Sequence, residues 1–363
     1  MQRIQSTVFG LLMLSVITFG IACVDLRDAG NSNAIQPDSQ AILLQRDQQN
    51  RKRNSQEQQN QQASEIQKVS TGFEVAPLST DPAINDWLDP HYVVIDQSAN
   101  LRNKLFVFFP GSFGNPSRQK LITQFAAKQG YHAINLNYPN SWTVDRLCRK
   151  NSAPDCYAKV RQEIIEGKDY SPLVNISPAN SIENRMLKLL QYLNQQYPQQ
   201  GWSQYFNKDM IKWDLVVVSG HSQGGGHAAM LGKQHRVARV IMLAAPADYS
   251  VVSSVVSGQI ASWLAAPGQT PPERYYGFAH IKDPGYARIQ KAWELLGMAN
   301  YGSAVNVDGQ QPPYNYSHRL ITALIPSRQG KYHGSVATDG TTPRQSDGTP
   351  VFQKVWQYLI RVS

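Results

Sequence analysis

The sequence predicts an α/β fold in which a mostly parallel central sheet is covered by helices on both faces. Two observations carry this prediction. Short apolar runs alternate along the chain with amphipathic stretches of helical period, and one wholly apolar run, residues 104–109, is closed by Pro110-Gly111. A wholly apolar strand is typical of a sheet buried on both faces. No strict Gly period, sustained heptad or second long apolar run is present, which excludes collagen-like, coiled-coil and polytopic membrane proteins.

Each expected element follows from its apolar pattern and its boundary residues. Strands are expected at residues 91–95, 104–109, 131–138, 213–218, 238–245, 275–280 and 320–325. Helices are expected from Asn115-Pro116 through the apolar face at 121–126, and at residues 181–198, 224–235, 285–298 and 351–362. Residues 141–180 and 249–272 interrupt this alternation, and we expect these insertions to lie over a site.

Length and charge narrow the function classes. The chain has 363 residues, which leaves room for one large domain or two ordinary ones, and its net charge is +9. Arg46, Arg51, Lys52 and Arg53 supply part of this charge, and the other charges are scattered. Because no basic stripe is interleaved with aromatic residues, nucleic acid is not an expected partner.

Residues 1–22 have the layout of a secretory signal peptide. Arg3 precedes an uncharged run over residues 8–22 that is too short to span a bilayer comfortably. The ending Phe19-Gly20-Ile21-Ala22-Cys23 resembles a bacterial lipobox, which implies that Cys23 is acylated and that a lipid anchor holds the protein at a membrane. An uncleaved anchor and an ordinary cleaved signal are the alternatives. The expected location is the cell envelope, on the periplasmic or outer-membrane face, and otherwise the protein is secreted.

Residues 23–70 are expected to form a low-complexity tether in front of a folded domain at residues 71–363. Residues 36–67 are dominated by Gln, Asn, Ser, Arg and Glu, so this segment cannot bury enough apolar surface to offset its ordering entropy. Inside the domain, Cys148 and Cys156 lie on a short loop that contains Pro154. Export would allow this pair to form a disulfide, with two unpaired thiols as the alternative.

The most informative stretch is Gly220-His221-Ser222-Gln223-Gly224, which follows an apolar strand and precedes a helix of small residues. A strand that reverses sharply into a helix strains the turn residue and lifts its side chain out at the edge of the sheet. Glycines are needed at both flanks because a Cβ atom there would collide with neighbouring backbone. The pattern therefore predicts that Ser222 is a nucleophile; a solvated serine in a glycine-rich turn is the alternative.

A serine nucleophile needs a base held by a third group, and the chain offers both after late strands. His333 follows the strand at 320–325 in a glycine-containing loop, whereas His318 precedes that strand. Asp283 lies in the turn Asp283-Pro284-Gly285 after the strand at 275–280, and Asp248 is the alternative acid. The resulting chain order is serine, acid and histidine.

Residues from about 90 to 363 resemble an α/β-hydrolase of the esterase and lipase kind, on the strand and helix order, the GHSQG elbow, the HIKDPG turn and the YHGS loop. The resemblance implies that Ser222 is the nucleophile, His333 the general base and acid, and Asp283 the group that orients it. It also implies an oxyanion site built from the backbone N–H groups of Gln223 and of Ser112 or Phe113.

The sequence is compatible with two functions. The first is an exported serine hydrolase that cleaves a carboxylic ester in a small molecule, lipid or polymer through an acyl-enzyme. The alternative is a catalytically inactive envelope binding protein with the same fold. No HExxH motif or paired Cys–His spacing is present, so neither a metal nor a cofactor is expected.

Overall fold

The computed structural model describes residues 46–57, 72–151, 153–250 and 259–362, in two separate parts. In the first part, residues 46–57 form a helix whose side chains are all exposed. This helix lies inside the segment predicted to be a tether. The predicted signal peptide at 1–22, the lipidation site at Cys23 and the rest of the tether lie outside the described residues.

The second part is built on a nine-stranded sheet with the spatial order β1-β2-β4-β3-β7-β8-β11-β13-β12. Its strands are β1 (Phe73–Val75), β2 (His91–Val94), β3 (Leu105–Phe109), β4 (His132–Asn135), β7 (Val216–His221), β8 (Arg239–Leu243), β11 (Tyr275–His280), β12 (Val305–Asn306) and β13 (Arg319–Thr322). From β4 to β12 every neighbouring pair is parallel, whereas β2 is antiparallel to both β1 and β4. The predicted mostly parallel sheet is confirmed.

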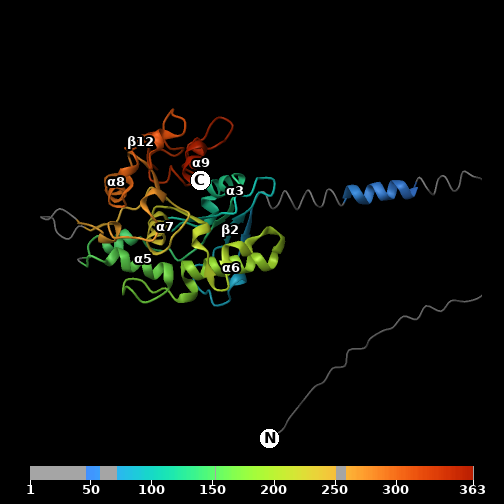
Figure 1. The fold of residues 1–363 in the computed structure, drawn as a ribbon, viewed down its shortest axis with the longest axis horizontal. Helices are drawn as coiled ribbons and strands as arrows, with labels where there is room; N and C mark the ends of the chain where they lie inside the picture. The colour runs from blue at the N-terminus through green and yellow to red at the C-terminus, as the bar shows by residue number, and fades with distance from the viewer. Residues whose placement is uncertain (1–45, 58–71, 152, 251–258, 363) are drawn as a thin grey trace, which may run out of the picture. The chain divides into compact units, whose positions relative to one another are not determined.

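Helices cover both faces of this sheet (Figure 1). They are α2 (Pro77–Thr80), α3 (Lys120–Lys128), α4 (Val144–Cys148), α5 (Cys156–Glu166), α6 (Ile182–Gln196), α7 (Gln223–Gln234), α8 (Tyr286–Leu295) and α9 (Gln353–Ile360). Two small hairpins stand apart from the sheet: β5 (Phe206–Asn207) with β6 (Met210–Ile211), and β9 (Tyr249–Ser250) with β10 (Gln259–Ile260).

Strand alternation divides the core into two clusters, one on each face of the sheet. In β3, Phe106 and Phe108 pack with residues of α3 and α9, while Leu105, Val107 and Phe109 pack with residues of α5, α6, α7 and α8. Successive side chains of a strand point to opposite faces, so a wholly apolar strand contributes to both clusters. Figure 1 shows α3 and α9 on one side of the sheet and α5 and α6 on the other.

The strand order places a crevice at the centre of the sheet. From β3 the chain crosses through α3 to β4 on one side, and from β7 it crosses through α7 to β8 on the other. Such a switch between neighbouring parallel strands opens a crevice at their carboxyl ends, where ligands bind in open α/β sheets. Phe109 pairs in register with Gly220, so the loops after β3 and β7 start side by side.

Several predicted boundaries are wrong, among them the starts of two elements, and for the first of these starts the deciding contact lies far away in sequence. The helix expected from Asn115-Pro116 starts as a short 3-10 turn, and α3 itself begins only at Lys120. There the carboxylate of Asp339 accepts hydrogen bonds from the backbone N–H groups of Lys120 and Leu121, at 2.9 and 3.2 Å. The strand expected from Trp213 also begins late, at Val216, because residues 213–215 form another 3-10 turn.

Candidate active site

Ser222 stands between β7 and α7 in a strained backbone conformation. Its φ and ψ angles are +54° and −120°, a combination that costs a residue with a side chain about 1–3 kcal/mol. Two backbone hydrogen bonds keep Ser222 in this conformation. Its N–H donates to the carbonyl oxygen of Leu243 at 2.9 Å, and the N–H of Gly226 donates to the carbonyl oxygen of Ser222 at 3.1 Å. The side chain is partly exposed at the carboxyl edge of the sheet.

The two glycines of the elbow are required by close backbone contacts. A Cβ atom on Gly220 would lie 2.3 Å from the carbonyl carbon of Gly224, and one on Gly224 would lie 2.1 Å from the carbonyl oxygen of Phe109. Neither neighbour is a flexible side chain that can move aside. The packing of β3, β7 and α7 therefore excludes any larger residue at both positions.

Ser222, His333 and Asp283 form one line of hydrogen bonds. Nε2 of His333 lies 2.7 Å from Oγ of Ser222, and Nδ1 of His333 lies 2.6 Å from Oδ2 of Asp283. The other carboxylate oxygen of Asp283 accepts the backbone N–H of Gly285 at 2.7 Å. The structure thus brings together three side chains that are 61 and 50 residues apart in sequence (283 − 222 and 333 − 283).

The carboxylate of Asp283 determines which ring nitrogen of the neutral imidazole carries the proton. Burial raises the pKa of Asp283, but the hydrogen bond and the positive charge available on His333, together with Gly285 N–H, hold the pKa below its ordinary value. Because Asp283 is therefore ionised at neutral pH, Nδ1 of His333 carries the proton and donates it. Nε2 is left as an acceptor for the hydroxyl of Ser222.

The candidate oxyanion donors come from two loops. Gln223 is the first residue of α7, so its backbone N–H lies at the positive end of the helix dipole. Within the described residues, the N–H groups of Gln223 and Ser112 have no hydrogen-bond acceptor. The N–H of Phe113, in contrast, donates to the carbonyl of Asn140 at 2.9 Å. Of the two residues suggested in the loop after β3, Ser112 is thus the one whose N–H is free to bind an oxyanion.

Hydrogen bonds with the side chains of Asn140 and Gln223 fix the loop after β3. The side-chain amide of Asn140 donates to the Gly114 carbonyl at 3.0 Å. The hydroxyl of Ser112 donates to Oε1 of Gln223 at 3.0 Å, and the N–H of Val144 donates to the same oxygen at 3.0 Å. Gln223 therefore connects the elbow, the loop after β3 and the start of α4.

His221 connects the elbow to the loop that carries His333. Its Nε2 lies 2.9 Å from the backbone carbonyl oxygen of His333, and the two rings are 4.9 Å apart. Burial and the neighbouring His333 lower the pKa of His221 to about 3, so the ring is neutral and Nε2–H donates. Sequence reasoning assigned no separate role to His221, although its place beside Ser222 was the available signal.

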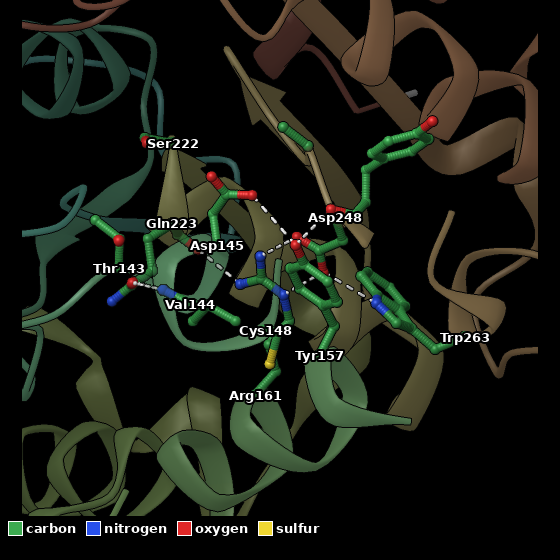
Figure 2. Close-up of polar contacts among 12 residues, drawn as sticks. Thr143, Val144, Asp145, Cys148, Tyr157, Arg161, Ser222, Gln223, Asp248 and Trp263 are labelled. Carbon is green, nitrogen blue, oxygen red and sulfur yellow. Dashed lines mark hydrogen bonds and ion pairs between the residues drawn. The ribbon is translucent and has the colours of Figure 1, made fainter. Parts of the chain in front are cut away.

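Asp248 is bound by Arg161 and not by His333. Nε and Nη2 of Arg161 donate to its two carboxylate oxygens at 2.8 and 2.6 Å, and Nε1 of Trp263 donates at 3.0 Å. Arg161 also donates from Nη1 to the carbonyl of Gln223 at 3.1 Å. Figure 2 shows Arg161 rising from α5, with its guanidinium pointing to Asp248 and to the backbone of Gln223. The alternative acid is thus engaged in a buried ion pair.

Arg161 is a residue that sequence reasoning missed. Its side chain is only 3% exposed, and a Cβ atom on Gly226 would lie 2.3 Å from its guanidinium carbon. Its position on α5, beside Tyr157, Val160 and Ile164, places a cation on the apolar face of the helix. A charged residue at an apolar position is the sequence signal that could have revealed it.

A disulfide joins Cys148 at the end of α4 to Cys156 at the start of α5, which confirms the predicted pairing. Both helices contribute to a cavity of about 700 Å³ that is also lined by Ser222, Asp283 and His333. The predicted insertion at 141–180 therefore forms a wall of the cavity. None of the described residues of the insertion at 249–272 lines the cavity; Trp263 supports its wall indirectly by binding Asp248, and residues 251–258 lie outside the described part.

Neither a metal-binding cluster nor a membrane-spanning helix is found in the described ranges. No group of three or more His, Cys, Asp or Glu side chains there could hold a metal ion. Likewise, none of the helices in those ranges has the length and apolar character needed to cross a bilayer.

The parallel sheet, the strand–elbow–helix unit at its centre and the chain order serine, aspartate and histidine define an α/β-hydrolase fold. No protein-family model matches the chain, and no curated protein matches it.

Several solved structures are similar to the chain. A sugar hydrolase from Lactococcus lactis is 15% identical, with a TM-score of 0.39, over 80% of this chain and 95% of that one. An esterase from the Planctomycetes species Thermogutta terrifontis is 14% identical, with a TM-score of 0.38, over 79% and 91% of the two chains. An acetyl xylan esterase from Aspergillus awamori is 14% identical, with a TM-score of 0.38, over 79% and 98%.

Proposed function

We propose that this chain is a serine hydrolase that cleaves carboxylic esters through an acyl-enzyme. The observation that supports the proposal most directly is the line of hydrogen bonds from Ser222 through His333 to Asp283, at 2.7 and 2.6 Å. A serine hydroxyl is a weak nucleophile at neutral pH, and it requires a base whose other nitrogen is held by a third group.

In the first half of the proposed reaction, Oγ of Ser222 attacks the ester carbonyl carbon while Nε2 of His333 takes the hydroxyl proton. The carbonyl oxygen becomes an oxyanion, which the N–H groups of Gln223 and Ser112 stabilise. One such donor is worth about 3–4 kcal/mol in comparable enzymes. The carboxylate of Asp283 keeps Nδ1 protonated and stabilises the imidazolium that forms.

The tetrahedral intermediate then collapses. The bond to the alcohol breaks, and His333 gives its proton from Nε2 to the departing oxygen, which leaves Ser222 acylated. A water molecule attacks the acyl carbon and transfers a proton to His333. The second collapse releases the acid and returns the proton to Oγ of Ser222. His333 is thus the base in each attack and the acid in each collapse.

The test is loss of activity in the Ser222→Ala variant. The purified chain is expected to hydrolyse a short-chain 4-nitrophenyl ester, and the variant is expected to lose at least about 10⁴-fold in kcat because the nucleophile is gone. Ser203→Ala is the matched control, since Ser203 is exposed on a 3-10 turn outside the cavity.

A fluorophosphonate probe separates the enzyme from the inactive binding protein. The probe is expected to label wild-type protein at Ser222 and to leave Ser222→Ala unlabelled. Folded wild-type protein that resists the probe and hydrolyses no ester would instead favour the inactive binding protein.

Export and lipidation are also proposed, on the sequence of residues 1–23 alone. In bacteria fed an alkyne-labelled palmitate, the full chain is expected to take up the label, and Cys23→Ser is expected to lose it. Label that persists in Cys23→Ser would contradict acylation at Cys23. An unlabelled mature protein that begins after residue 22 would point to an ordinary cleaved signal.

A further inference from the structure

We infer that the cavity at Ser222 selects esters that carry an anionic group, such as a carboxylate, over neutral esters of the same size. This inference rests on the proposed function, because it concerns the substrate of the same site. Its starting point is the composition of the cavity wall. Five cationic side chains line the cavity against three carboxylates: Arg146, Arg149, Lys150, Arg161 and Arg288 against Asp145, Asp248 and Asp283.

Two of the three carboxylates are already bound to partners inside the protein, so neither is free to pair with the remaining cations. Asp248 is matched one to one by Arg161, in a forked ion pair that is 3% exposed on each side. Asp283 is bound to Nδ1 of His333, and the imidazolium that forms in catalysis offsets its charge. Neither carboxylate is available to the other four cations.

Asp145, the third carboxylate, is shared by two arginines. It pairs with Arg149, the C-cap residue of α4, and with Nη1 of Arg288 from α8, the latter at 2.9 Å. The hydroxyl of Tyr157 also lies 3.2 Å from it, so its lone pairs are well occupied. One negative charge thus faces two positive charges, and the group retains an excess of one.

Arg146 and Lys150 add the remaining excess. Both are exposed, and in the described parts of the chain no carboxylate pairs with either of them. Together with the Asp145 group they give an uncompensated positive charge to the cavity that Ser222 also lines. A cleft lined by one sign of charge concentrates ligands of the opposite sign.

The apolar side chains of the cavity wall also favour an anionic substrate over one with a long acyl chain. Its apolar side chains are small: Val144, Ala244, Ala247 and Pro284. A long acyl chain would gain little from these residues, since hydrophobic stabilisation scales with the apolar area that is buried. An anionic substituent near the scissile carbonyl, in contrast, would find several guanidinium groups that favour carboxylates.

The experiment compares matched pairs of esters that differ in charge. In the first pair the difference lies on the acyl side: mono-4-nitrophenyl adipate carries a carboxylate there, and 4-nitrophenyl hexanoate does not. The 4-acetoxybenzoate anion and 4-acetoxybenzamide differ in the same way on the alcohol side. The anionic member of at least one pair is expected to have a kcat/KM about tenfold higher at low ionic strength. This preference is expected to shrink in 0.5 M NaCl, because salt screens exposed charges.

Charge-removing variants locate the effect. Arg146→Gln, Lys150→Gln and Arg288→Gln are each expected to lower the ratio of anionic to neutral kcat/KM by a factor of about 1.4 to 5, the range that exposed ion pairs contribute. Arg288→Lys is expected to restore most of the ratio. Lys291→Gln is the matched control, since Lys291 lies on the same helix, is exposed and pairs with Glu294 outside the cavity; it is expected to leave the ratio unchanged.

Binding to the Ser222→Ala variant tests the inference without turnover. Calorimetry is expected to give tighter binding for the anionic member of the preferred pair, whether or not the wild-type protein proves to be an esterase. Equal or weaker binding of the anionic member in both pairs would overturn the inference, as would a ratio that Arg288→Gln and Lys291→Gln change equally. Labelling of Ser222 by a fluorophosphonate would still stand in that case, so the two failures are distinguishable.

Discussion

Asp283 and Asp248 lie in the wall of the same cavity, yet their partners give them different roles. Asp283 accepts from the imidazole of His333 at 2.6 Å, a group that gains and loses a proton during the proposed reaction. Asp248 accepts from Arg161, whose guanidinium stays charged throughout. The first contact can change with the chemistry, whereas the second can only hold the structure together.

Asparagine substitutions are expected to separate these two roles. Asp283→Asn leaves the shape of the site but presents the wrong hydrogen-bonding group to His333, so we expect kcat to fall by about 10³–10⁴-fold. Asp248→Asn leaves the buried Arg161 without its counter-ion, and we expect it to cost about 3–5 kcal/mol in the free energy of unfolding. Urea denaturation and ester hydrolysis measure both quantities. A stable Asp248→Asn protein with lost activity, beside an active Asp283→Asn, would move the catalytic acid to Asp248.

Among the elements, α4 and α5 act as one unit because the disulfide joins them. The N–H of Val144, at the start of α4, holds the side chain of Gln223, and Arg161 on α5 holds the backbone carbonyl of the same residue. Both helices therefore contribute a hydrogen bond to Gln223, whose backbone N–H is one of the two proposed oxyanion donors. The cross-link limits how far one contact can move relative to the other.

Removal of the disulfide is expected to affect stability first and activity second. The double variant Cys148→Ser, Cys156→Ser is expected to lose about 2–3 kcal/mol in the free energy of unfolding, since the chain-entropy model gives this value for so short a loop. We also expect kcat to fall, because Val144 and Arg161 would no longer be held together at Gln223. Cys23→Ser is the matched control and should change neither quantity. An unchanged kcat in a clearly destabilised double variant would contradict the coupling to Gln223.

The sequence predicted elements well wherever the deciding contacts are local. Strand β11 has its expected bounds, and α6 begins at the predicted cap, where the hydroxyl of Ser181 accepts the N–H of Asn184 at 3.2 Å. The start of α3 was missed because its capping group, Asp339, comes from a loop more than two hundred residues away. No local pattern contains such a partner.

The same distinction applies to the site. The elbow could be predicted because its glycines and strained serine lie within a segment of five residues, 220–224. The roles of Asn140, which occupies the N–H of Phe113, and of Arg161 could not, because each depends on which side chains the fold brings together. Both aspartates fit the chain order, and the turn Asp283-Pro284-Gly285 indicated which of them would meet His333. Only the fold shows that Asp248 has Arg161 as its own partner.

On the scale of the whole molecule, several histidines are buried in the neutral form. Burial, with nearby positive groups, lowers the pKa of His91 and His221 to about 3 and that of His318 to about 4. An unfolded chain would protonate all three near the ordinary pKa of about 6.5. Each histidine therefore contributes stability that is complete above about pH 6.5 and is lost as the pH falls toward its folded value.

We expect the midpoint of thermal unfolding to fall steadily as the pH is lowered from 7 to 4.5. Each buried histidine contributes a slope of up to about 1.4 kcal/mol per pH unit. Asp339 works in the opposite direction, since burial raises its pKa to about 6 and the folded state gains a proton below that pH. Three histidines outweigh one aspartate, so the net stability declines.

The variant His318→Phe tests the origin of this slope. Its ring can keep the stacking of His318 between Tyr276 and Tyr301, at centroid distances of 3.9 and 4.5 Å, but it cannot take up a proton. We therefore expect a shallower decline in the free energy of unfolding between pH 6.5 and 4.5. Tyr301→Phe, which alters the same stack and leaves the imidazole in place, should keep the wild-type slope. Equal slopes in wild type and His318→Phe would contradict this prediction. They would mean that the imidazole of His318 is already protonated in the folded protein, where a nearby negative charge would have to offset its desolvation.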